Sequence, residues 1–200
     1  MHLQTILAAL LISISLLLFG CGTSPKTQLY ILNPIDRDTS VQKSDVQSIV
    51  IKVGPVSIPD TLDRQQIVTR IGSNELNADE FNRWSGDFQD DIQRILGENI
   101  SILLPTSQIA LGRETTLLPI DFQVIINVRE FDGQLGGVVT LNADWTVARK
   151  GKKKTVVAKK SVLQEKTNGT DYKDYVAAQS RLLAKLSQEI ADEIGDQFNK

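Results

Sequence analysis

An uncharged apolar run near the amino terminus constrains the chain more than any other feature. Residues 6–19 carry no charged side chain and are interrupted only by Ser13 and Ser15. These fourteen residues would span about 21 Å as a helix, which is too short for a hydrocarbon core of about 30 Å. A run of this length is typical of a secretion signal. The sequence therefore predicts a cleaved signal peptide over residues 1–20.

The run ends at Cys21, and the residues before it resemble the lipobox of lipoprotein signals. Gly20 precedes the cysteine directly, and Leu18 lies three residues before it. The resemblance implies a diacylglycerol on the Cys21 sulfur and acylation of the amino group freed by cleavage. Two or three acyl chains anchor a protein stably, whereas one is marginal. An ordinary cleaved signal and an uncleaved anchor with a buried free cysteine remain as alternatives.

The residue after the cysteine bears on which membrane would hold the anchor. Gly22, and not an aspartate, follows Cys21. By the sorting preference of such lipoproteins in two-membrane bacteria, this favours the periplasmic face of the outer membrane over retention in the inner one. We expect residues 21–28 to form a short polar tether between the lipids and the folded part.

The inventory of reactive side chains excludes several classes of function. The chain has one histidine, His2, and one cysteine, Cys21. After cleavage and acylation it would hold no free imidazole or thiol, which removes Ser-His-Asp and Cys-His catalysis, the usual Cys/His zinc sites and disulfides. We therefore expect a non-catalytic protein without cofactor or metal. A net charge of −2 does not favour a nucleic-acid partner.

The remaining residues suit one folded domain, which we place at residues 29–200. Hydrophobic residues make up 41% of the chain and charged residues 23%, as in an average globular protein. Short apolar runs predict strands at 29–32, 49–53 and 66–70, the second of them inside a sheet covered by helices. Alternating apolar residues from Ile120 to Lys166 predict three long strands in a meander.

Apolar residues spaced three or four apart predict two helices. The first would begin at Phe81, end near Gly97 and Asn99, and lead into a short extended piece over 102–105. The second would run from Tyr172 to the end of the chain, with Asp171 available near its start as a cap. The expected fold class is α/β: a mixed, partly antiparallel sheet flanked by helices in a single domain.

The remaining candidate motifs are weak. Gly151–Thr155 matches only the tail of a phosphate-binding loop and falls in a hairpin. A basic run over 149–160 could meet anionic headgroups, although an exposed hairpin tip explains it more simply. Asp90 with Asp91, or Asp79 with Glu80, could be proposed as the carboxylates of an envelope hydrolase, but a solvated face is the simpler interpretation.

The most specific segment lies at residues 53–70. Several short motifs match, in order, those of the ABC-type transport auxiliary lipoprotein family, which the chain resembles over nearly its whole length. They are Tyr30-Ile31-Leu32, Ile58-Pro59, Leu62-Asp63-Arg64, Gln66-Ile67-Val68 and Trp84, the last marking the start of a helix in the family. The chain departs from the family at Thr61, Gln65 and Gly86, which concerns the local loop geometry.

The resemblance implies a role as well as a fold. It implies an outer-membrane-anchored component of an intermembrane lipid transport system, working with a mammalian-cell-entry domain protein, a permease and an ATPase. Pro59, Leu62, Asp63 and Arg64 then form a candidate partner-contact loop, for which a purely structural role is equally compatible. Assembly into a homo-oligomer stays open, and the alternative function is a stand-alone periplasmic lipid-binding lipoprotein.

Overall fold

The computed structural model describes residues 25–36, 49–104, 107–112, 119–150 and 155–198. The predicted signal peptide, Cys21 and the turn at 151–154 lie outside these ranges. The elements in chain order are β1 (Gln28–Tyr30), β2 (Ile49–Ser57), β3 (Gln66–Gly72), β4 (Glu75–Trp84), α2 (Phe88–Leu103), β5 (Ser107–Leu111), β6 (Phe122–Gly133), β7 (Val138–Arg149), β8 (Thr155–Lys166) and α3 (Tyr172–Phe198).

Five strands form the larger sheet, in the order β5-β2-β6-β7-β8. The strand β2 lies between β5 and β6 and is parallel to both, while β6, β7 and β8 form an antiparallel meander. The meander and the inner position of β2 confirm the sequence prediction. The sheet is mixed, as expected, and the fold is a single α/β domain.

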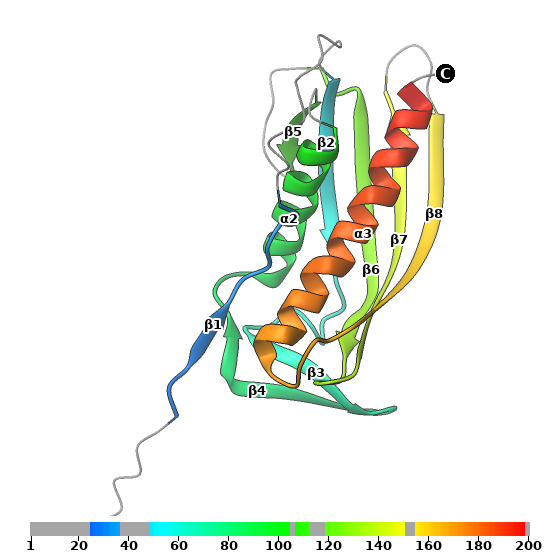
Figure 1. The fold of residues 1–200 in the computed structure, drawn as a ribbon. Helices are drawn as coiled ribbons and strands as arrows, with labels where there is room; N and C mark the ends of the chain where they lie inside the picture. The colour runs from blue at the N-terminus through cyan, green and yellow to red at the C-terminus, as the bar shows by residue number, and fades with distance from the viewer. Residues whose placement is uncertain (1–24, 37–48, 105–106, 113–118, 151–154, 199–200) are drawn as a thin grey trace, which may run out of the picture.

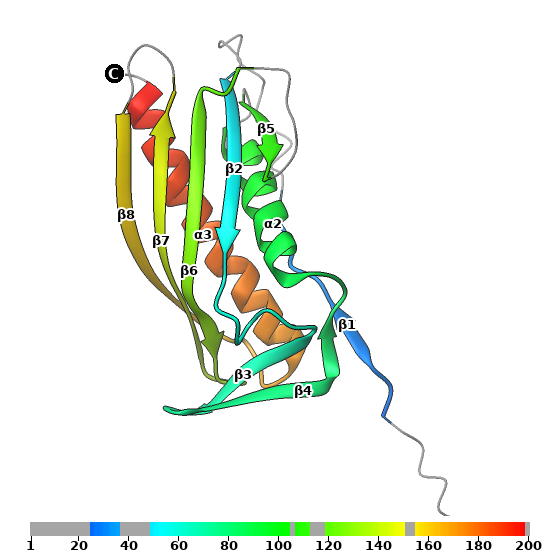
Figure 2. The same cartoon turned by 180° about the vertical axis from the view of Figure 1, so that it is seen from behind.

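Both helices pack on the same face of this sheet (Figures 1 and 2). Alternate residues of β6 and β7 point into the core below the helices; Val124, Ile126, Leu141 and Val147 are all buried there. On the opposite face Ile125 is exposed, and no helix of the described chain covers it. The expected sheet flanked by helices is therefore confirmed, with both helices on one face.

Polar contacts join the edge strand β8 to the long helix α3. Glu165 pairs with Arg181 and Lys185 at 2.8 and 2.6 Å. The hydrogen bonds from Lys185 and Arg181 lower the pKa of the Glu165 carboxyl. The Asp171 carboxylate accepts from the Asp174 N–H at 2.8 Å, as predicted for a cap at the start of α3.

A smaller sheet of order β1-β4-β3 closes one end of the molecule (Figure 1). β3 and β4 form an antiparallel hairpin, and β1 adds to β4 in parallel. Arg70 of this hairpin binds Asp132 at the end of β6 through two hydrogen bonds of 2.7 and 3.0 Å. The Asp132 side chain is only 7% exposed, so a largely buried ion pair joins the two sheets.

The prediction that the first helix begins at Phe81 is wrong. Phe81 and Trp84 belong to β4, and α2 begins at Phe88 after its N-cap Asp87. The carboxylate of Asp87 accepts from the Asp90 N–H at 2.9 Å, which fixes the start of the helix. The pairing of β4 with β1 and β3 keeps the preceding residues extended.

The predicted end of this helix is also wrong. α2 continues through Gly97 and Asn99 to Leu103, so residues 102 and 103 of the expected extended piece are helical, and Leu104 is the C-cap. Gly97 is buried, and a Cβ there would lie 2.5 Å from the Leu111 side chain, so the glycine permits close packing against β5. Neither β4 nor β5 was predicted as a strand.

Candidate partner-binding site

The family-like loop joins the larger sheet to the smaller one. It occupies residues 58–65, between the end of β2 and the start of β3. Its path is set by two tight turns, in which the Leu62 N–H donates to the Pro59 carbonyl and the Arg64 N–H donates to the Leu62 carbonyl, both at 2.9 Å. Pro59 fixes its own backbone at the first of these turns and is half-buried.

Leu62 anchors this loop in the apolar core. Its side chain is only 3% exposed and belongs to the same buried cluster as Trp84 and Phe88, whose rings stack at 4.2 Å between centroids. The Trp84 N–H donates to the Gln65 carbonyl at 2.7 Å, which holds the end of the loop against β4. Leu62 is therefore a structural residue, and a partner could not reach it without opening the core.

Asp63 and Arg64 are exposed on the same loop and border a surface hollow. This hollow has a volume of about 240 Å³ and is completed by Gln65 and by the start of α2 from Gly86 to Phe88. A second hollow, also of about 240 Å³, shares the Gly86–Asp87 turn and extends along α2 toward Asp91 and Arg94. The hollow along α2 is mainly apolar with Asp90, Asp91 and Arg94 in its lining, whereas the hollow beside Asp63 and Arg64 is more polar.

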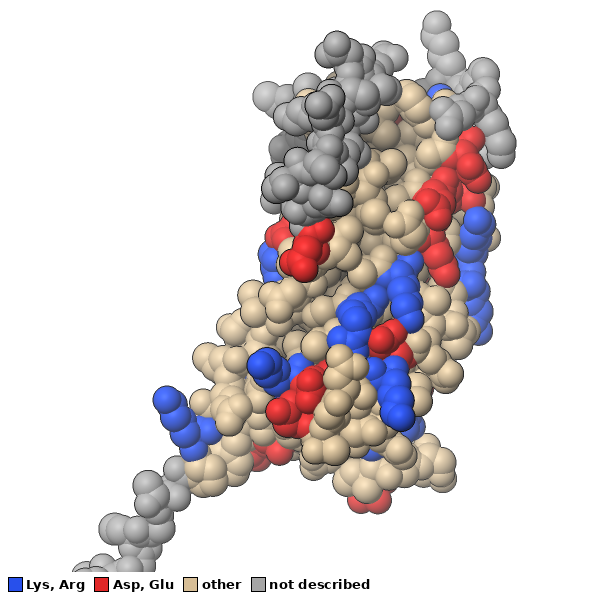
Figure 3. Space-filling model, viewed as in Figure 1, with Lys and Arg blue, Asp and Glu red and all other residues tan. Residues whose placement is uncertain are grey.

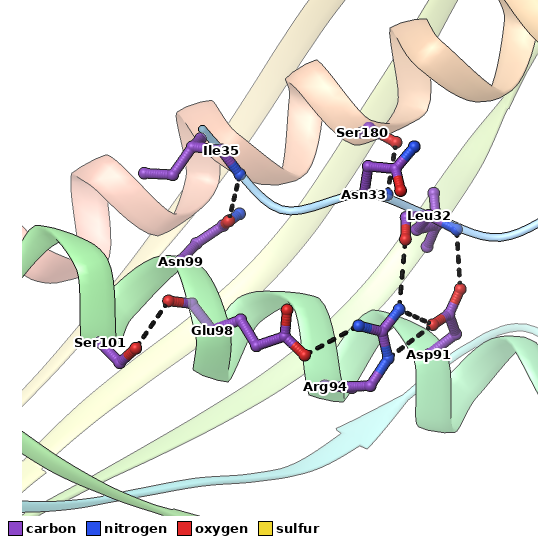
Figure 4. A network of polar contacts seen from close by, with 9 residues as sticks. All are labelled: Leu32, Asn33, Ile35, Asp91, Arg94, Glu98, Asn99, Ser101 and Ser180. Atoms are coloured by element: carbon purple, nitrogen blue, oxygen red, sulfur yellow. Dashed lines mark hydrogen bonds and ion pairs between the residues drawn. The ribbon is translucent and has the colours of Figure 1, made fainter. Parts of the chain in front are cut away.

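A clamp on the segment that follows β1 is the feature that the sequence analysis missed (Figure 4). The Leu32 N–H donates to Asp91 of α2 at 2.9 Å, and the Ile35 N–H donates to Asn99 of α2 at the same distance. The Asn33 N–H donates to Ser180 of α3 at 3.1 Å. Residues 32–35 therefore lie over both helices, bound by side chains far away in sequence.

Arg94 completes this clamp by bonding to both the segment and the helix. Its guanidinium donates to the Leu32 carbonyl at 3.2 Å and pairs with Asp91 and Glu98 on α2 (Figure 4). Burial disfavours its charge, but the hydrogen bonds with Asp91 and Glu98 outweigh that effect and raise the pKa of Arg94. The spacing of these three residues, three and four apart, is the one sequence signal that could have indicated the network.

Two of the carboxylates considered for hydrolysis, Asp91 and Asp79, have structural partners. Asp91 belongs to the clamp, and Asp79 accepts hydrogen bonds from the backbone N–H groups of Phe81 and Asn82, each at 2.8 Å. No cluster of three or more metal-binding side chains occurs within the described ranges. In the same part of the chain, neither helix is long and apolar enough to cross a bilayer.

The family model for the ABC-type transport auxiliary lipoprotein component matches residues 30–191. The chain belongs to this family. The match contains the loop, both hollows and the clamp, so these features lie within the family domain. Membership identifies a membrane-anchored lipoprotein that is associated with an ABC-type transport system, and it indicates a non-catalytic role.

Solved structures support the fold of this auxiliary lipoprotein. A crystal structure described as an uncharacterized protein is 20% identical, with a TM-score of 0.68, and covers 85% of this chain and 99% of its own. Protein XCC0632 from Xanthomonas campestris is 16% identical, with a TM-score of 0.61 and the same coverage. At these identities the similarity shows the fold alone. A comparison with curated proteins gives no match.

Proposed function

We propose that the chain is the outer-membrane lipoprotein component of an intermembrane lipid transport system of the mammalian-cell-entry and ABC type. The family match carries this proposal, because it covers most of the folded domain and names an auxiliary transport lipoprotein. The domain itself catalyses nothing. It receives or aligns the far end of a lipid conduit whose energy comes from an ATPase elsewhere in the system.

Cys21 supplies the anchor in this proposal. Its acyl chains hold the domain at the periplasmic face of the outer membrane, and Gly22 favours that destination over the inner membrane. The first described residue, Pro25, follows Cys21 by four residues, which span at most about 14 Å when extended. The domain is therefore kept close to the bilayer, where a conduit from the inner membrane would end.

The loop at residues 58–65 is the proposed contact with the mammalian-cell-entry protein. Asp63 and Arg64 are exposed on it, while Pro59 and Leu62 hold its conformation from below. A rigid backbone that presents two opposite charges gives a defined orientation to a docked polypeptide. A homo-oligomer would repeat this contact around the end of the conduit.

The alternative function is a lipoprotein that binds lipid alone. A lipid carrier needs a large apolar pocket to cover the acyl chains. A hollow of about 580 Å³ lies beside Asn33–Asp36 and includes Asp36, Glu98 and Ser101 in its lining. These polar groups favour the transporter component over the carrier.

Purification of the tagged full-length protein from native membranes in mild detergent tests the proposal. We expect a mammalian-cell-entry domain protein in the eluate. A charge-reversed loop variant, Asp63→Arg with Arg64→Asp, should lose that partner and stay membrane-bound, because both side chains are exposed. Lys173→Glu, at an exposed position on α3, is the control and should retain it. Repeated absence of the partner, even after crosslinking, would favour the stand-alone lipid-binding protein.

A further inference from the structure

An apolar surface that the proposed function does not use lies on the outer side of the small sheet. Leu29 is 65% exposed, Ile31 is 50% exposed and Phe81 is 40% exposed. We call these three residues the tether patch. At the hairpin end of the same sheet Ile71 and Leu76 are also exposed, so more than half of the exposed large hydrophobic residues of the described chain gather around this sheet.

The strand register places the tether patch on one face. Leu29 pairs with Arg83, and Tyr30 pairs with Trp84. Because side chains alternate along a strand, Leu29 and Ile31 share a face with Arg83, and Phe81 lies two residues before Arg83 on that face. Trp84 is buried on the other side, in the core. Leu29 and Phe81 therefore point away from the core, and Ile31 lies at the edge of the patch, where it also borders the hollow along α2.

The backbone under the patch is held in place. Asp79 accepts hydrogen bonds from the backbone N–H groups of Phe81 and Asn82, each at 2.8 Å. Burial would raise the pKa of Asp79, but these two bonds, together with bonds from the Asn82 side chain and Tyr172, outweigh that effect and lower it. The Ser85 N–H donates to the Tyr30 carbonyl at 2.8 Å. Contiguous exposed apolar surface is a feature of protein and membrane interaction sites.

We infer that the tether patch inserts into the headgroup and acyl boundary of the membrane that holds the Cys21 anchor. This inference rests on the anchor of the proposed function. Leu29 follows Cys21 by eight residues, so an extended chain places it at most about 28 Å from the lipidated residue. The chain leaves the domain through β1 at the end closed by the small sheet, whereas β8 begins at the opposite end (Figures 1 and 2).

The charges around the patch indicate how it would bind. Arg83 on this face pairs with Glu80 at 2.9 Å, and Lys26, three residues before Leu29, is exposed. Figure 3 shows both signs on the surface near the amino end and no extended basic area there. Attachment therefore depends on apolar insertion more than on attraction to anionic lipid, and it should change little with salt.

A single fluorophore tests this insertion in the lipidated full-length protein. Because Cys21 is the only cysteine and is acylated in the proposed protein, Leu29→Cys introduces one thiol for an environment-sensitive dye. In proteoliposomes that contain spin-labelled phospholipid, we expect the dye at this position to lose most of its emission. Phe81→Cys is the second test position in case the first variant folds poorly. Val156→Cys, 69% exposed near the start of β8, is the matched control and should keep its emission.

Each outcome distinguishes the patch from the anchor. Equal emission from the Leu29→Cys and Val156→Cys proteins in quenching liposomes would overturn the inference. A dye at position 29 that is shielded from iodide but not reached by the lipid quencher would also overturn it, since a protein or a second copy of the chain would then cover the patch. The intact mass of the purified protein separately reports whether Cys21 is acylated, so failure of the anchor is seen independently.

Discussion

The ion pair between Arg70 and Asp132 gives the sharpest test of how the two sheets are joined. Asp132 is nearly buried, while the Arg70 side chain is 30% exposed. Removing the arginine leaves a buried carboxylate without its two charged hydrogen bonds, a change that typically costs 3–5 kcal/mol. Because water can reach the vacated position through the exposed part of Arg70, we expect Arg70→Met to destabilise the protein by about 3 kcal/mol.

Substitution of the partner carboxylate, Asp132, should cost less stability. Asp132→Asn leaves an arginine that water can solvate, so we expect a loss of about 1–2 kcal/mol. The double variant should then show a coupling free energy of about 2 kcal/mol between the two residues. Urea denaturation in detergent, followed by the fluorescence of the buried Trp84 and Trp145, measures each free energy of unfolding.

A matched control lies on the open face of the larger sheet. Arg129 binds Asp144 at 2.8 Å, a distance close to that of the buried pair, but the two side chains are 60% and 41% exposed. Arg129→Met should therefore cost less than about 1 kcal/mol. If Arg70→Met and Arg129→Met destabilised the protein equally, burial would not be what makes the Arg70–Asp132 pair strong, and the reasoning would be refuted.

Three further substitutions test the fold. Because the pKa of Glu165 is lowered in the folded state, its ion pairs stabilise the protein at neutral pH, and this stabilisation is lost as the pH falls through the folded-state pKa. Glu165→Gln should therefore lower the free energy of unfolding by about 1 kcal/mol at pH 7. In acid the stabilities of variant and wild type should become equal, which urea denaturation across pH measures. The buried Tyr175 hydroxyl donates to the Val68 carbonyl at 3.0 Å, and Tyr175→Phe should lower stability by about 1 kcal/mol, measured by thermal unfolding. Gly54 has a φ of +117°, and a Cβ there would lie 2.6 Å from the Gln93 side-chain oxygen. Gly54→Ala should therefore cost about 2 kcal/mol in the same assay, and an unchanged melting temperature would contradict this.

Periodicity predicted the meander and the last helix because those elements are long and regular. It failed at Phe81 and Trp84, where a spacing of three and four residues across a strand end and a helix start imitates one helical stripe. The deciding local signal was Asp87 with Asp90 three residues later, which marks an N-cap. The predicted helix end at Gly97 was wrong for a different reason. This glycine lies within α2 and permits close packing against β5, a tertiary contact that a local sequence pattern does not reveal.

The candidate site was predicted only in part. The exposed loop residues Asp63 and Arg64 could be chosen because the family motif identifies them, but the motif could not separate them from the buried Leu62. The clamp on residues 32–35 could not be predicted, since its bonds join residues 59 to 147 positions apart. Such contacts depend on how the helices pack, and that packing cannot be predicted from local patterns in one sequence.

β1, which follows the proposed anchor in the chain, and the proposed contact loop meet at one place in the fold. The Trp84 N–H donates to the Gln65 carbonyl of the loop, and the next residue, Ser85, donates to the Tyr30 carbonyl of β1. The end of β4 thus bonds the loop on one side and β1 on the other. The clamp fixes residues 32–35, directly after β1, to both helices, so β1 and the loop are held in a fixed arrangement. A membrane that orients β1 would therefore also orient Asp63 and Arg64 toward an approaching partner.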